Sequence, residues 1–471
     1  MTNINEYFSL GLTNEDDPIV DDVVINTIRT PPDTKSTNFN RIIVSLPKVG
    51  LLTKDSCLVV QPRQAAASTH SGSNVSVNIV NGVLGAVKRC TLTIDGKELT
   101  NIEHPSLVET NRMYAKNTPA AMADYQRAVL GNAFEVTNIR QTFKTATSQG
   151  MEVLSQNSPV VVDQDDNIVV LGNKLSKTTA NNTKYSVPLH MLGMSFLRHE
   201  ALPVHLMKDR EIVLEVEFDS DCRNWCFCAE EALGASDCEI NLDACELVTT
   251  HIQQNEELEQ SLFNDLKETS RVYDLVETYL IKQSMVSNNV DTQTNTLVRL
   301  NLQNRELQKI LQVQHNVEVT GEGLCANQAS VSLGDVSLNH RANGRFIFDR
   351  RVSNNAQLYY LNSIYNGEDG LKVSNNAWSQ TDLQTNAQLT SPDKDFTEYC
   401  GNFNYLGVSY RNGNSGVFGA GTVQTTPLEI HFDNVSRKQV DPVQVGEKDL
   451  FYFVSVSKRL VIGPANVMMS F

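Results

Sequence analysis

Short strands of period two, separated by tight-turn dipeptides, constrain this chain more than any other sequence feature. In EIVLEVEF (residues 211–218), apolar side chains alternate with mostly charged ones, which predicts a strand with one apolar and one wet face. Similar runs recur along the chain, and Asn-Gly or Asp-Gly pairs such as Asp95-Gly96 and Asn343-Gly344 lie between them. These pairs favour tight hairpin turns. The pattern predicts antiparallel sandwiches or barrels and not a doubly wound sheet.

Helical signal is sparse and suggests where the chain divides. Residues 119–131 open with Pro and close with Gly, which favours a short helix. In residues 255–272, leucines recur every four positions, as on one face of a helix. This second segment lies between two β-rich halves of about 200 residues, each large enough for one β-sandwich. We therefore expect two domains joined by a helical junction. Residues 1–35 carry an acidic cluster and form either an arm over a neighbour or a frayed terminus.

The charge balance excludes one class of protein. The chain has 471 residues, 39 Lys and Arg, 55 Asp and Glu, and a formal net charge of −16. A polyanion would be repelled at long range, so we expect no direct binding of nucleic acid. No apolar run reaches the roughly 18 residues of a transmembrane helix. The first twenty residues are polar and acidic, unlike a secretory signal. We therefore expect a protein made inside a cell, with its nine cysteines as free thiols.

Three groups of residues resemble catalytic or metal sites at first sight, but none of them predicts such a site. Five cysteines lie between Cys222 and Cys245, but their spacing is not that of common zinc sites, and buried thiols are the better interpretation. His199-Glu200 precedes His205 by the wrong interval for a zinc helix. Carboxylates two residues apart, such as Glu215 and Glu217, occur on any solvated strand face as well as in glycosidases. We expect no catalytic, cofactor-binding or metal-binding residues.

One basic patch stands out against the acidic background. It lies on the hairpin sequence NHRANGRFIFDRR and comprises His340, Arg341, Arg345, Arg350 and Arg351. One interpretation is a surface that docks an acidic partner, or an acidic arm of a neighbouring subunit. The other is a solvated hairpin with local ion pairs. The sequence does not separate these two interpretations.

Three segments together resemble a known family. They are AVKRCTLTIDGKELTNIEHPSLVETNRMY (residues 86–114), YSVPLHMLGMSFLRHEALPVHLMKDREIVLEVEF (residues 185–218), and the final strands PLEIHFDNVS and DLFYFVSVSKRLVIGPANVMMSF. The chain resembles the double-jelly-roll major capsid proteins of double-stranded DNA viruses, which include nucleocytoplasmic large DNA viruses, virophages and polinton-like viruses. Asp95-Gly96 stands where large-virus members often have two glycines, and LHMLGMSF stands where they often have an aromatic-rich strand. These differences point towards a virophage or polinton-like relative, or towards a divergent member.

The resemblance implies an all-β fold of two consecutive eight-stranded antiparallel jelly rolls, with a few short helices in loops and at the junction. The expected parts are an N-terminal arm (1–35), a first jelly roll (36–254), a helical junction (255–272) and a second jelly roll (273–471). Loops between strands are expected to decorate the surface, with residues 324–388 as the best candidate.

The resemblance also implies a structural, non-enzymatic protein of the virion. Such a protein would be made and assembled inside the host cell, as homotrimeric pseudo-hexagonal capsomers of an icosahedral shell. Its partners would be itself, neighbouring capsomers, and penton and minor capsid proteins. Two alternatives are a carbohydrate- or receptor-binding β-sandwich of a virion, such as a fibre or lectin-like module, and a jelly-roll enzyme. Aromatic residues make up 7% of the chain and Trp only two positions, which weakens the sugar-binding alternative.

Overall fold

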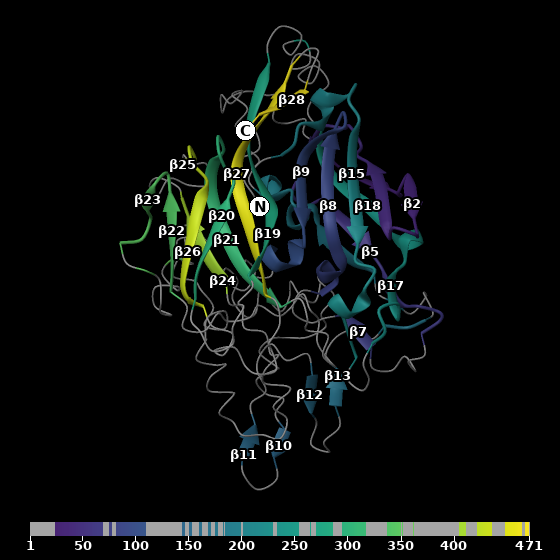
Figure 1. Cartoon of the computed structure of the whole chain (residues 1–471). Helices are drawn as coiled ribbons and strands as arrows, with labels where there is room; N and C mark the ends of the chain where they lie inside the picture. The colour runs from purple at the N-terminus through teal and green to yellow at the C-terminus, as the bar shows by residue number, and fades with distance from the viewer. Residues whose placement is uncertain are drawn as a thin grey trace.

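The computed structural model describes the strands of both halves of the chain and part of the segments between them (Figure 1). The described residues are 24–68, 75–77, 82–109, 144–146, 150–152, 160–162, 168–170, 175–177, 182, 184–198, 201–228, 233–253, 264, 270–285, 294–316, 337–349, 351, 361, 405–410, 422–435, 448–463 and 467–470.

The first half forms two five-stranded antiparallel sheets. One has the order β1-β18-β5-β14, with β4 paired to β18, and the other has the order β2-β3-β15-β8-β9. Their bounds are β1 Val24–Thr30, β18 Glu246–Gln253, β5 Cys57–Val60, β14 Tyr185–Pro188, β4 Leu51–Leu52, β2 Thr34–Ser36, β3 Arg41–Ser45, β15 Ile212–Phe218, β8 Val87–Ile94 and β9 Lys97–Glu103.

The second half forms a six-stranded and a four-stranded antiparallel sheet. The larger has the order β19-β27-β21-β24, with β25 paired to β21 and β28 to β27; the smaller has the order β20-β26-β22-β23. Their bounds are β19 Arg271–Met285, β27 Lys448–Ile462, β21 Glu306–Asn316, β24 Tyr405–Ser409, β25 Thr422–Val423, β28 Val467–Ser470, β20 Thr294–Leu300, β26 Leu428–Val435, β22 Ser337–Ala342 and β23 Arg345–Phe346.

Short elements complete the described chain. Four two-stranded sheets pair β6 Pro62–Gln64 with β17 Cys238–Ile240, β7 Val75–Val77 with β16 Cys226–Cys228, β10 Lys144–Ala146 with β11 Gly150–Glu152, and β12 Val160–Val162 with β13 Ile168–Val170. The 3₁₀ turns are η3 Gly82–Ala86, η6 Leu189–Met191, η7 Ser195–Arg198, η8 Val204–Met207, η9 Cys222–Asn224 and η10 Leu242–Ala244. Residues 105–109 are α-helical.

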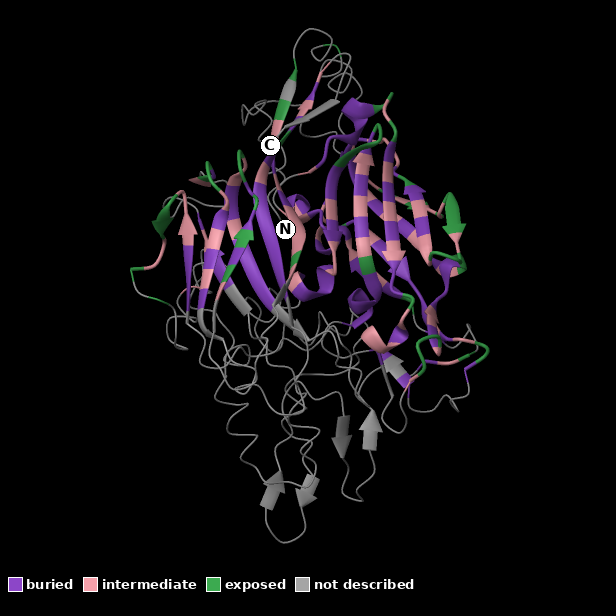
Figure 2. Cartoon of the chain, viewed as in Figure 1, coloured by how far each residue is buried: buried purple, intermediate pink, exposed green. Residues whose placement is uncertain are grey.

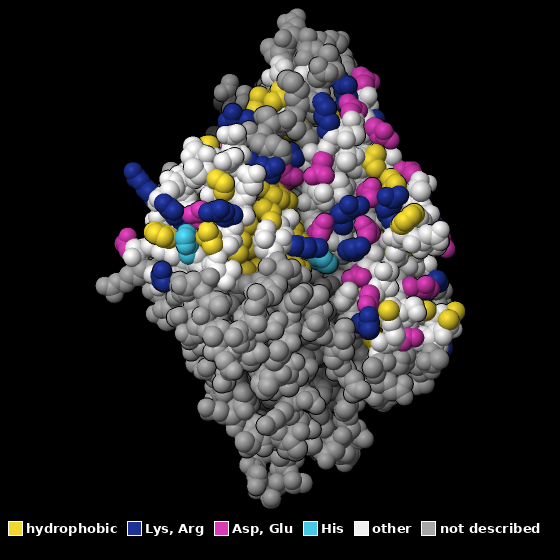
Figure 3. Space-filling model, in the orientation of Figure 1, with side chains coloured by type: hydrophobic (Ala, Val, Ile, Leu, Met, Phe, Trp, Pro, Cys, Tyr) yellow, Lys and Arg dark blue, Asp and Glu magenta, His cyan; other side chains and the backbone are white. Residues whose placement is uncertain are grey.

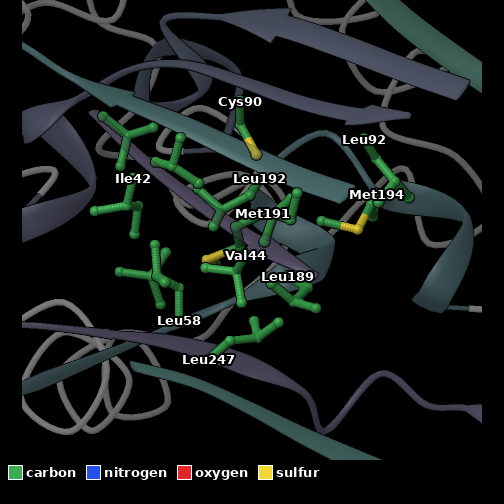
Figure 4. Close-up of a cluster of buried hydrophobic side chains, with 14 of the residues drawn as sticks. Ile42, Val44, Leu58, Cys90, Leu92, Leu189, Met191, Leu192, Met194 and Leu247 are labelled. Atoms are coloured by element: carbon green, nitrogen blue, oxygen red, sulfur yellow. The ribbon is translucent and has the colours of Figure 1, made fainter. Parts of the chain in front are cut away.

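The predicted alternation appears in the strands and explains the core of the first jelly roll. Along β15, the apolar residues from Ile212 to Phe218 are buried, and the residues between them are half-buried. Strands β5 and β18 present Leu58 and Leu247 towards side chains of β3 and β8, with residues 189–194 packed between the sheets (Figure 4). The second core is built in the same way, and β27 is buried along most of its length (Figure 2).

Two predicted hairpin turns have the expected backbone. Asp95 and Gly96 have φ values of 50° and 72°, and Asn343 and Gly344 have φ values of 48° and 78°. Positive φ at both central residues defines the type I′ turn that matches the twist of paired strands. The sequence pairs therefore join β8 to β9 and β22 to β23 as expected.

These paired sheets make the fold a double jelly roll, as predicted, with two differences in detail. Residues 24–30 and 34–36 of the predicted arm are β1 and β2, because their backbones pair with β18 and β3. At the junction, Asn264 is helical but β19 begins at Arg271, so the strand includes the last two residues predicted as helix. Residues 255–263 and 265–269, the helix over 119–131 and most of residues 324–388 lie outside the described residues.

Candidate functional site: the interface between the two jelly rolls

Two long strands belong to the hydrophobic cores of both jelly rolls. β19 and β27 are 15 residues long and pair along their full length, from Arg271↔Ile462 to Met285↔Lys448. At one end of the pair, Leu275, Leu460 and Ile462 lie in the core cluster of the first jelly roll. Further along β27, the inward side chains from Leu450 to Val456 lie in the core of the second. The same backbones therefore tie the two domains together.

A third apolar cluster fills the interface itself. Residues 105–109, which follow β9, place Leu107 against Leu311 and Val313 of β21 and against Phe451 and Phe453 of β27. Four of these five side chains belong to the second jelly roll and one to the first, so the cluster exists only when the two domains are in contact. Burial of such side chains stabilises a fold by about 1.5–3 kcal/mol each.

A buried lysine anchors the polar part of the interface. Lys458 Nζ donates to the carbonyl oxygens of Glu98 and Leu99, at 2.9 Å each, and lies 3.1 Å from Glu277 Oε2. Both charged side chains are nearly inaccessible, at 3% for Lys458 and 4% for Glu277. Burial raises the pKa of Glu277, and Lys458 offsets part of that shift. The ammonium thus joins a strand of one jelly roll to a strand of the other.

More exposed contacts line the edge of the interface. Lys282 Nζ of β19 lies 2.8 Å from Glu103 Oε2 of β9. The ring of His104 stacks on Phe451 of β27, with centroids 5.9 Å apart. Burial raises the pKa of Glu103, but Lys282, His104 and Arg89 outweigh that effect, so the pKa lies below its usual value. Apolar, buried ionic and rim contacts together fix the orientation of the two domains.

The part of the chain that the structure describes holds no cluster of metal-ligand side chains, at this interface or elsewhere: no group of three or more His, Cys, Asp or Glu side chains in it could hold a metal ion. None of the described helices has the length and apolar character needed to cross a bilayer. The arrangement can hold two domains rigidly, and its charged groups are engaged in structural bonds.

The paired carboxylates on β15 take part in an ion-pair network on the outer face of the first jelly roll. Glu215 Oε1 lies 3.0 Å from Arg41 Nη1 and 3.4 Å from Arg89 Nη2. Glu217 pairs with Lys88 at 2.7 Å and with Arg89 at 3.4 Å. Each carboxylate is matched by two basic side chains, as in a solvated strand face.

The histidine constellation is not assembled as a metal site in the described chain. His205 is buried in η8, and its Nδ1 lies 2.8 Å from the carbonyl oxygen of Gly50. That hydrogen bond joins η8 to the turn before β4, which is a structural role. His199 and Glu200 lie outside the described residues.

The described cysteines are free thiols and mostly buried. Cys222 Sγ donates to the carbonyl oxygen of Gly234 at 3.1 Å. A hydrogen bond with Cys238 and burial both raise the pKa of Cys222, and burial raises the pKa of Cys245 to about 12. Thiols with raised pKa values are poor nucleophiles and poor metal ligands. This agrees with the interpretation of the cysteines as small core residues.

In the predicted basic hairpin, the histidine and the arginines have different environments. His340 is fully buried, and its Nδ1 lies 2.5 Å from Tyr410 Oη. Arg341 reaches Glu429 at 3.2 Å, while Arg345 and Arg351 are exposed. Arg350 lies outside the described residues. The patch is therefore an arginine surface without the histidine.

Sequence reasoning missed the polar anchor of the interface. Alternate residues of β27 share one face of the strand, and most of them, such as Val456 and Leu460, are apolar. Lys458 lies on that face between them and places a charge among apolar side chains. Glu277 interrupts β19 in the same way, between Leu275 and Tyr279. A lysine and a glutamate that each occupy an otherwise apolar face of a strand indicate a buried ion pair. The partner carbonyl oxygens on β9 have no sequence signal.

Trp225 bears on the sugar-binding alternative. It is fully buried in the first jelly roll, beside η9. A carbohydrate platform needs an exposed aromatic face, which this side chain does not offer. The other tryptophan, Trp378, lies outside the described residues.

Solved structures share this fold across almost the whole chain. VP54 of PBCV-1, fitted into a reconstruction of the virophage Sputnik, aligns with a TM-score of 0.58 at 11% identity, covering 96% of this chain and 97% of that one. A chain of the PBCV-1 capsid aligns with a TM-score of 0.55 at 11% identity, over 96% and 97%. The Faustovirus major capsid protein aligns with a TM-score of 0.53 at 13% identity, over 94% and 91%.

The chain therefore has the fold of the double-jelly-roll viral major capsid proteins. Among solved structures, the likeness extends to proteins of PBCV-1 and Faustovirus. At sequence level, no family model and no curated protein matches it.

Proposed function

We propose that this chain is the major capsid protein of a virus. The observation that carries the proposal is the two-domain fold, which aligns with capsid proteins over more than nine-tenths of the chain. The buried interface supports it, because a shell subunit needs domains with a fixed mutual orientation.

The proposed assembly is a homotrimer in which six jelly rolls form a pseudo-hexagonal capsomer. Capsomers would tile an icosahedral shell, with penton and minor capsid proteins as further partners. The protein would be made and assembled inside the host cell and reside in the virion. A net charge of −16 argues against direct contact with the genome. The proposed division of the chain places the two jelly rolls on either side of residues 254–270, since no described sheet mixes strands from both sides.

Size-exclusion chromatography with light scattering tests the trimer, and negative-stain microscopy tests its shape. We expect three times the 52.3 kDa mass of one chain and particles with a three-fold axis and a hexagonal outline. A chain that stays monomeric at micromolar concentration contradicts the proposal. A monomer that binds immobilised glycans would favour the carbohydrate-binding alternative instead.

A further inference from the structure

The four-stranded sheet of the second jelly roll presents a mixed basic and apolar outer face. Paired residues share a face of a sheet, and the register pairs Leu297 with His431, Arg299 and Arg341 with Glu429, and Phe346 with Arg341. We name these six residues the arginine face. Figure 3 shows basic, histidine and apolar side chains together at the end of the molecule formed by these strands.

Positive charge predominates among the described side chains of the arginine face. Glu429 is shared by Arg299 at 3.3 Å, Arg341 at 3.2 Å and His431 at 3.5 Å. Burial raises the pKa of Glu429, but these neighbours outweigh it and leave the pKa below its usual value. Arg345 pairs with Ala342, so it lies on the opposite face of the hairpin and outside the arginine face. One carboxylate therefore faces two arginines and one histidine.

Apolar side chains are exposed within the same face. Phe346 is 55% accessible and Leu297 is 42% accessible. The Phe346 ring lies edge-on to His431, with centroids 5.3 Å apart, and Arg341 lies 5.9 Å from its centroid. An exposed phenylalanine among arginines is typical of an interaction surface. A partner of the arginine face therefore needs carboxylates and apolar side chains close together along its chain.

Residues 1–23 of this chain have that chemistry. They include six Asp or Glu residues, namely Glu6, Glu15, Asp16, Asp17, Asp21 and Asp22, and no Lys or Arg. Apolar residues such as Tyr7, Phe8 and Leu10 lie among them. Twenty-three residues can extend over about 75 Å. The segment is therefore long enough to leave its own domain and cross a neighbouring surface.

We propose that residues 1–23 of one copy dock on the arginine face of a neighbouring copy. The inference rests on the proposed function, which supplies the neighbour. Residue 24 begins β1 in the first jelly roll, whose strands lie at the opposite end of the molecule from β23 (Figure 1). Head-to-tail contact between copies brings these two ends together and closes a ring. Each copy then contributes one acidic segment and one basic face.

Photo-crosslinking of the full-length chain tests this placement. A benzoylphenylalanine replaces Phe8, and chains labelled with ¹⁵N are mixed with unlabelled chains before assembly. We expect cross-linked peptides that join residue 8 to the strands carrying Arg299 or Phe346, with one isotope on each side. The inference is overturned if every cross-linked pair of peptides carries a single isotope, which means that the links form within one chain. It is also overturned if residue 8 is linked to the first jelly roll.

Charge variants show whether the arginines hold the segment. We expect the double change Arg299→Glu and Arg341→Glu to lower the yield of this cross-link at least tenfold. Adding Asp16→Lys and Asp17→Lys to the same chain should restore most of the yield, because the charges are exchanged. The matched control is Arg89→Glu on the first jelly roll, which should leave the yield unchanged. If Arg89→Glu lowers the yield of the cross-link as much as the double change does, the proposal is wrong.

Light scattering on the same samples separates this inference from the proposed function. A trimer that forms without the cross-link overturns the docking of residues 1–23 and leaves the capsid proposal standing. A chain that is monomeric by light scattering overturns the capsid proposal, and with it the neighbour that the docking requires.

Discussion

Lys458 and Glu277 form an ion pair in which both charges are buried at the boundary between two domains. Nζ also donates to two backbone carbonyl oxygens of the opposite jelly roll. The pair therefore connects the strand partners β19 and β27 to β9. Because water cannot replace a lost partner at this depth, removing either charge leaves the other uncompensated.

Replacing Lys458 with Met should lower the free energy of unfolding by about 3–5 kcal/mol, because Glu277 and two carbonyl oxygens lose their partner. Urea denaturation followed by tryptophan fluorescence measures the change. The matched control is Lys282→Met, which removes the more exposed pair with Glu103 and should cost less than about 1 kcal/mol. Equal losses in the two variants would show that Lys458 is not an anchor.

The cost of Lys458→Met should also depend on pH. Burial already raises the pKa of Glu277 above its ordinary value of 4.5, and loss of the ammonium raises it further. A folded pKa above the unfolded one means that stability is complete below the unfolded pKa and declines as pH rises through the folded pKa. The difference between the wild type and the variant should thus be smaller at pH 4 than at pH 7. A difference that grows towards pH 4 contradicts this assignment.

Gly50→Ala should be among the most destabilising substitutions in the first jelly roll. Gly50 has φ +59°, and an added Cβ would lie 2.2 Å from the carbonyl oxygen of Ile252. We expect a loss of more than about 3 kcal/mol, or no folded protein. Gly96→Ala is the matched control: its φ is +72°, but no atom lies within 4 Å of the added Cβ. This variant should lose only the left-handed backbone cost of about 1–2 kcal/mol, measured by urea denaturation.

His340 should make the second jelly roll sensitive to acid. Its burial lowers the pKa to about 3 from an ordinary value of 6.5. The unfolded chain therefore binds the proton first, so stability is complete above pH 6.5 and is lost as pH falls towards 3. Within that window the loss approaches about 1.4 kcal/mol per pH unit.

The variant His340→Gln isolates this contribution, because Gln can retain a hydrogen bond with Tyr410 and does not titrate. Its free energy of unfolding, measured from pH 7 to pH 4, should fall less steeply than that of the wild type. Parallel pH profiles for the two proteins would show that His340 is not the responsible group.

The ion pairs of Glu215 are expected to contribute little. Glu215→Gln breaks its contacts with Arg41 and Arg89, which are all partly exposed. The loss should be below about 1 kcal/mol at low salt and should vanish near 1 M salt, where screening is strong. Urea titrations at both salt concentrations measure it. A salt-independent loss of several kcal/mol would contradict the interpretation of this network as a solvated face.

Local features of the fold could be predicted from the sequence because they depend on neighbours in the chain. The alternation in β15 and the turn at Asp95-Gly96 are set by side-chain direction and backbone φ, which short segments determine. The bounds of the N-terminal arm could not be predicted, because residues 24–30 become a strand only by pairing with β18 more than 200 residues later. The polar sequence of this segment alone predicts an arm outside the first jelly roll.

The interface could not be predicted for the same reason. Lys458 and the carbonyl oxygens of Glu98 and Leu99 are about 360 residues apart in the chain. Nothing in either segment alone specifies the other. The arginine face was only partly predicted: Arg341 belongs to the predicted basic hairpin, whereas Arg299 and His431 join it through strand pairing.

The sharing of β19 and β27 between two cores has a mechanical consequence. A load on one jelly roll passes into the other along two continuous backbones whose side chains are packed at both ends. The two jelly rolls of each copy then move together as one stiff body, without a hinge at this boundary. In any assembly of such bodies, a change of curvature is taken up where copies meet, so the joints between subunits set how sharply the assembly can curve.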